Sequence, residues 1–289
     1  MLIVYNFEYK NSMLKRKLTL EEDIQSFKLT HYKNADFDSF HNKTIKLFNR
    51  FNRVKDKRKQ KEIILELYAT YLQATEILFI NAHALSVKNT YFPSALFIDS
   101  TNLRKFIESN FIKNTKLSSW FLDKVIFATK IKNGEYVNTY SMYSNLLKEV
   151  SHDYLENFDS LNAYKHGYRV SANFNSNILS LVIDSNKSIK LDESDSTITY
   201  YSKENIEGVP TIIEHSLNFK VGRVFGKCLF VSSLLNNMRA TILLSYKEKV
   251  RSKEISSFSI HDKEAWRKTF GGSHIKQHIF SIERRKMKG

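Results

Sequence analysis

Apolar residues recur every three or four positions through most of the first 170 residues, the period of an amphipathic helix. Thr19 stands three residues before Glu22, a spacing typical of a helix start. Asp99 or Ser100 is expected to cap a later helix. The predicted helices cover 19–31, 36–53, a long stretch through Ile64, Leu67 and Leu78, two segments within 91–133, and 135–168.

The pattern changes after this helical region. The runs 177–184, 196–202 and 211–219 are β-branched or alternating, and polar turn-forming stretches separate them, which predicts three short antiparallel strands. From Val221 to Tyr246 the helical period returns, with apolar residues on nearly every side. A helix of that kind is expected at the centre of the core.

These elements predict a mainly α fold: a helical bundle with a small antiparallel β insertion before the last core helix. Only 8 Gly and 2 Pro occur in 289 residues, which favours long helices over a many-stranded sandwich. We expect residues 1–246 to form the helical domain, with the insertion at about 172–220, and 247–289 to form a basic C-terminal extension.

The net charge indicates what kind of molecule the protein binds. A net charge of +15 and a pI near 9.6 indicate an anionic partner, with nucleic acid ahead of a membrane. The run VKDKRKQK at 54–61 is open to two interpretations, a solvated helix junction or a phosphate-binding patch. The end of the chain, with Arg284, Arg285 and Lys286, is likewise either a solvated terminus or a binding arm.

The chain has one cysteine, Cys228, so it has no internal disulfide framework and fits a reducing compartment. No window of about 20 residues is free of charge, and the N-terminus lacks the pattern of a secretory signal. We therefore predict a cytoplasmic protein without membrane spans.

Candidate chemistry gathers on the helix that ends near residue 168. At about 100° per residue, two groups separate onto different sides of residues 152–169. The apolar group is Tyr154, Phe158, Leu161, Tyr164 and Tyr168. The polar group is His152, Asp159, Asn162, His166 and Arg169.

The polar group fits acid–base chemistry on an anion. His166 suits proton transfer near neutral pH, Asn162 can orient it, and Arg169 or Lys165 can stabilise charge on a phosphate. The pair in HIKQH at 274–278 lacks the Glu of a zinc-protease motif, and the chain has no Walker or dinucleotide fingerprint. We expect no metal and no cofactor, and RNA cleavage by its own 2′-hydroxyl is the natural candidate.

The string LNAYKHGYRV, which ends a bundle helix before a β segment, resembles the HEPN superfamily of prokaryotic RNases and RNA-binding proteins. Branches ending in Asn-x-x-Lys-His-Gly are the most similar. The resemblance implies a helical bundle and metal-independent endoribonuclease activity in toxin, abortive-infection or CRISPR-linked antiviral defence. It also implies RNA as partner, often a homodimer with a composite cleft, and a partner protein from a defence or toxin–antitoxin operon.

The family motif is an Arg, a short spacer and a His. His166 matches the His, whereas none of the three positions for the Arg is basic: Asp159, Ser160 and Leu161. Either Arg169 or Lys165 takes that role, or the chain is a catalytically inactive RNA- or protein-binding module. The predicted catalytic residues are His166, Asn162 and Arg169, and the predicted substrate-binding residues are Lys165, Asp159 and Tyr168.

Overall fold

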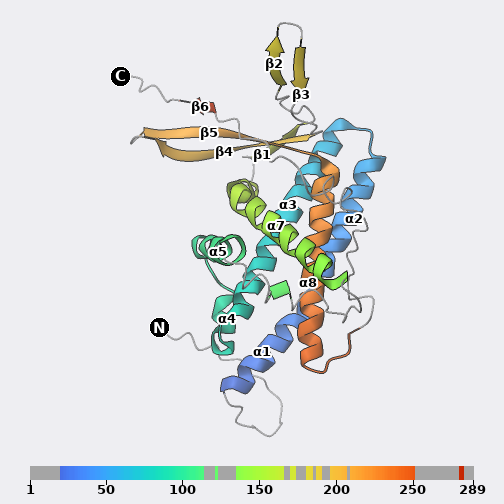
Figure 1. Cartoon of the computed structure of the whole chain (residues 1–289), viewed down its shortest axis with the longest axis vertical. Coiled ribbons are helices and arrows are strands. Elements are labelled where there is room, and N and C mark those ends of the chain that lie inside the picture. Colours follow the sequence, from blue (N-terminus) through green and yellow to red (C-terminus); the bar gives the residue numbers. More distant parts are fainter. Residues whose placement is uncertain are drawn as a thin grey trace, which may run out of the picture.

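The computed structural model describes residues 20–113, 121–122, 135–165, 170–173, 180–184, 187–190, 196–206, 209–250 and 280–282. Within these ranges the chain is a mainly α helical bundle beside a small antiparallel sheet, which confirms the predicted fold class (Figure 1). The helices are α1 (Leu20–Asn34), α2 (Asp38–Arg53), α3 (Lys57–Ser86), η1 (Asn89–Tyr91), α4 (Phe92–Ala95), α5 (Ser100–Ile107), η2 (Glu108–Ile112), α7 (Glu135–Lys165) and α8 (Val221–Ser245).

The long helices α3 and α8 pack side by side in the middle of the bundle (Figure 1). The side chains of α8 that reach zero exposure include Val231, Leu234 and Leu235, so the prediction of a central core helix is confirmed. Both helices are long and apolar enough to cross a membrane by composition. However, 67% of the apolar window in α3 and 72% of that in α8 are buried inside the protein, as expected of core helices.

Two aspartate side chains cap the N-termini of helices. The Asp99 side chain accepts hydrogen bonds from the Asn102 backbone N–H (2.9 Å) and from Asn102 Nδ2 (2.6 Å), so the predicted cap is confirmed. These bonds hold the pKa of the Asp99 carboxyl below its usual value. Asp56 caps α3 in the same way, accepting from the backbone N–H groups of Arg58 and Lys59.

Strands β1 to β5 lie between α7 and α8, as predicted, whereas β6 follows α8. All three predicted strands exist, and three short ones were missed: β1, β3 and β6. One sheet has the order β1-β4-β5-β6, and β2 and β3 form a separate hairpin. The strands are β1 (Val170–Asn173), β2 (Ser180–Asp184), β3 (Lys187–Lys190), β4 (Ser196–Ile206), β5 (Val209–Phe219) and β6 (Phe280–Ile282).

Strands β4 and β5 form a long hairpin whose register runs from Ser196 opposite Phe219 to Ile206 opposite Val209. The basic C-terminal extension contributes β6, which pairs antiparallel with β5 so that Ile282 lies opposite Ile212. This short stretch of the extension is therefore docked on the sheet. The expectations for Thr19 and for Arg284–Lys286 fall outside the described residues.

Candidate functional site

The last turns of α7 carry three of the predicted site residues. Asp159 and Lys165 are exposed, and Asn162 is half-buried. The helix continues without interruption to Lys165, the residue before the predicted catalytic His. The predicted residues that lie outside the described part of the chain are His166, Tyr168 and Arg169.

One side of these turns is packed into the bundle. Tyr154 and Leu161 have no exposed surface and Phe158 is 6% exposed, so the predicted apolar stripe is confirmed over these residues. The rings of Tyr154 and Phe158 meet edge to face at 5.7 Å. The guanidinium of Arg104, from α5, lies 5.3 Å from the centroid of the Phe158 ring. The packed side fixes how the polar side is presented to solvent.

Lys165 does not stand alone as a cation. Its Nζ lies 2.6 Å from Glu76 Oε2, and the Tyr154 hydroxyl donates to Glu76 Oε1 at 3.3 Å. Since the Lys165 side chain is 39% exposed, this ion pair is worth no more than about 1 kcal/mol. A phosphate can compete for Lys165, but it must displace a carboxylate of α3 to do so.

The structure adds a buried charge pair that the sequence reading missed. Lys227 Nζ lies 2.5 Å from Asp153 Oδ2, and the Tyr71 hydroxyl donates to the same oxygen at 2.8 Å. The two charged residues are 8% and 3% exposed, and they join the central helix α8 to α7. The sequence did contain a sign of this pair, because Lys227 is a charged residue inside an otherwise apolar run.

A chain of buried hydrogen bonds continues from this pair along α7. Asn157 Nδ2 donates to the Asp153 carbonyl at 2.8 Å, and Ser160 Oγ donates to the Asn157 carbonyl at 2.6 Å. The Tyr68 hydroxyl of α3 lies 3.4 Å from Ser160 Oγ. Burial raises the pKa of the Tyr68 hydroxyl, which keeps it neutral. Because all of these groups are buried, they hold α3 against α7 rather than meeting a substrate.

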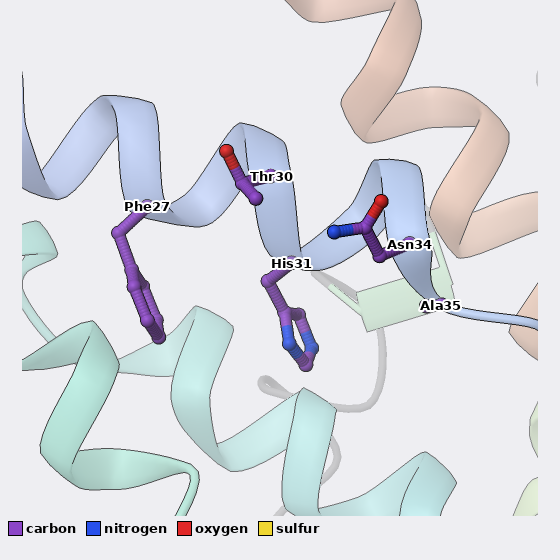
Figure 2. Close-up of a pocket in the computed structure, with 5 residues that line it drawn as sticks. All are labelled: Phe27, Thr30, His31, Asn34 and Ala35. Carbon is purple, nitrogen blue, oxygen red and sulfur yellow. The ribbon is translucent and has the colours of Figure 1, made fainter. Parts of the chain in front are cut away.

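A separate pocket of about 330 Å³ lies along α1. Figure 2 shows Phe27 and His31 pointing to the same side of the helix, one turn apart. Burial lowers the pKa of His31, and its Nε2 lies 3.4 Å from Asn81 Oδ1. The ring also meets Phe92 edge to face at 6.0 Å, so His31 serves packing between α1, α3 and α4.

Cys228 is buried, as predicted, with its Sγ 2.8 Å from Thr44 Oγ1. Burial raises the pKa of its thiol to about 12. The thiolate is the reactive form, so we expect no modification of the folded protein by a disulfide reagent at pH 8 and rapid modification in denaturant. Fast labelling without denaturant would contradict this burial, and a Cys228→Ser variant gives the blank.

The raised pKa of the Cys228 thiol also makes the free energy of unfolding depend on pH. The folded protein keeps the thiol proton up to about pH 12, whereas an unfolded chain releases it near the ordinary value of 9.0. The folded state therefore binds more protons in this window, and this contribution to the free energy of unfolding is lost as pH rises from about 9 to about 12.

Among the described residues, no group of three or more His, Cys, Asp or Glu side chains is arranged to hold a metal ion. His274 and His278 of the HIKQH string lie outside that part of the chain. Comparison with family models, curated proteins and solved structures finds no match for this chain. The geometry of the last turns of α7 is therefore the basis for a functional proposal.

Proposed function

We propose that this chain is a HEPN-like, metal-independent endoribonuclease that acts in bacterial defence as a toxin or in abortive infection. The observation that carries the proposal is the end of α7. Its apolar side is buried, its polar side carries Asp159 and Asn162, and its last residue, Lys165, directly precedes His166. The net charge of +15 suits an RNA substrate.

In this mechanism His166 acts as the acid–base group or orients the attacking 2′-hydroxyl. Asn162, one turn earlier on α7, positions it. Arg169 and Lys165 hold the scissile phosphate, with Lys165 exchanging its Glu76 partner for the phosphate oxygens. A homodimer that brings two copies of His166 to one cleft is part of the same proposal.

A second candidate is a catalytically inactive helical module that binds RNA or a partner protein. One observation favours it. Ser160 and Leu161, two of the three positions where the family keeps its Arg, are 2% and 0% exposed, and Lys165 is already paired. Because no basic residue occupies those positions and Lys165 is paired, the negative charge that develops on the phosphate must be stabilised by Arg169.

Cleavage of RNA in the presence of EDTA separates the two candidates. We expect wild-type protein to degrade total RNA and the His166→Ala variant to cleave at least about 100-fold more slowly, since positioned acid–base groups contribute that much or more. His152→Ala is the matched control, because it removes a half-buried imidazole of α7 and should leave the rate unchanged. Equal cleavage by wild type and His166→Ala, or none at any concentration, would contradict the nuclease and leave the binding module.

A further inference from the structure

Cations are concentrated where α2 passes into α3. Between Lys43 and Lys61 the chain has nine Lys or Arg and one acidic residue, Asp56. Two of the cations have carboxylate partners. Lys43 Nζ lies 3.1 Å from Glu66 Oε1, and Arg58 Nε lies 3.8 Å from Glu62 Oε1. Six exposed cations have no ion pair with any described residue, and we call them the basic junction: Lys46, Arg50, Arg53, Lys55, Lys57 and Lys59.

The basic junction is held in a fixed shape. Gln60 Nε2 donates to the Val54 carbonyl at 2.7 Å and to the Phe51 carbonyl at 3.4 Å, and the Val54 N–H donates to the Arg50 carbonyl. Beneath it, the Phe48 ring stacks on Phe225 of α8 at 3.9 Å. The cations are therefore presented by a turn that is fastened to the core, rather than by a loose segment.

The two junction cations on α3 do not serve the stability of the fold. A helix N-terminus carries positive partial charge, so Lys57 and Lys59 in the first turn of α3 are placed unfavourably. Arg50 and Arg53, in the last turn of α2, lie where the dipole of that helix favours cations, but they add to the same local concentration of positive charge. A bound polyanion would offset the unfavourable placement of Lys57 and Lys59, which indicates a partner rather than a structural role for them.

The surroundings favour a nucleic acid over a membrane. A helix that lies on a membrane needs large apolar side chains beside its cations. Among the described residues of α2 and the first turns of α3, only Ile45 is a large exposed apolar residue, and it is 37% exposed. The exposed side of α2 instead carries the amides Asn42, Asn49 and Asn52, which suit phosphate and sugar contacts.

We propose that the basic junction binds the sugar–phosphate backbone of RNA, at a surface separate from the end of α7. Lys57 begins α3 and Glu76, the partner of Lys165, lies 19 residues further along the same helix. At 1.5 Å per residue this is about 28 Å, so the basic junction lies well away from Lys165 at the end of α7. Binding here does not depend on cleavage and holds for either proposed function.

The test compares two variants with the same loss of charge. The junction variant is Arg50→Gln, Arg53→Gln, Lys57→Gln and Lys59→Gln. The control variant changes four exposed lysines elsewhere in the described chain: Lys88→Gln, Lys105→Gln, Lys148→Gln and Lys249→Gln. Both carry His166→Ala, so that the probe, a labelled single-stranded RNA of mixed sequence, stays intact. Fluorescence anisotropy at several salt concentrations gives the affinity.

Each phosphate contact contributes about 0.7 to the salt slope of single-strand binding, so losing four lowers the slope by about 3. We expect the junction variant to bind on the order of 100-fold more weakly at about 0.2 M salt, and the control variant to stay within about threefold of the parent. The midpoint of urea unfolding should change little in the junction variant, because removing Lys57 and Lys59 from the first turn of α3 is stabilising whereas removing Arg50 and Arg53 from the last turn of α2 is destabilising by a similar amount.

Equal weakening in both variants would overturn the proposal, since net charge alone would then explain the affinity. Unchanged RNA affinity in the junction variant, with loss of binding to phosphatidylserine vesicles, would assign the surface to a membrane instead. A failure of His166→Ala to slow cleavage bears only on the nuclease, because the binding assay is read in a protein that already lacks that imidazole.

Discussion

Replacing Asp153 with Leu is expected to lower the free energy of unfolding by about 3–5 kcal/mol. The change leaves the Lys227 ammonium, 8% exposed, without the carboxylate oxygen that now lies 2.5 Å away. The Tyr71 hydroxyl loses its acceptor at the same time. Burying an uncompensated charge is far more costly than the mutual attraction of a solvated pair.

Urea unfolding followed by circular dichroism measures this change. The matched control is Glu76→Gln, which breaks the more exposed pair with Lys165 and should cost no more than about 1 kcal/mol. Adding Lys227→Met to Asp153→Leu removes the stranded charge, so the double variant should recover most of the lost stability. A double variant no more stable than Asp153→Leu would mean that packing, rather than charge, dominates at this position.

The second large effect is expected at Phe79, on α3. Its side chain has no exposed surface and lies edge to face with Phe111 of η2 at 5.0 Å, and 6.0 Å from Tyr154 of α7. Phe79→Ala should lower the free energy of unfolding by about 3–5 kcal/mol, because a cavity opens where three elements meet.

Phe97 supplies the control for that experiment, since its side chain is 85% exposed and Phe97→Ala should change stability by less than about 0.5 kcal/mol. Both are measured by urea unfolding under the same conditions. A cost at Phe79 below about 1 kcal/mol would show that the bundle closes around the missing ring, contrary to close packing of α3, η2 and α7.

The long helices were predictable because each repeats its apolar residues over many turns. Tyr154, Phe158 and Leu161 lie on one side of α7, as their spacing indicated. Strands β1 and β3 have four residues each, and β6 has three. Segments this short carry no readable alternation, and β1 and β6 are decided by pairing with strands far along the chain.

At the end of α7, too, local spacing was predictable and long-range pairing was not. The spacing of residues on α7 was local information, and it brought Asp159 and Asn162 to the side away from the apolar stripe. The partners of α7 come from far along the chain: Glu76 is 89 residues from Lys165, and Lys227 is 74 from Asp153. No periodicity reports such pairings, because they depend on how whole helices cross.

Strand β6 has a practical consequence for handling the protein. It covers the backbone N–H and C=O groups of β5 over Ile212–Glu214, which would otherwise form an open strand edge. Open edges recruit strands from other molecules and lead to aggregation. Shortened versions of the chain made for crystallisation should therefore retain Phe280–Ile282, even though these residues are far in sequence from the helical bundle.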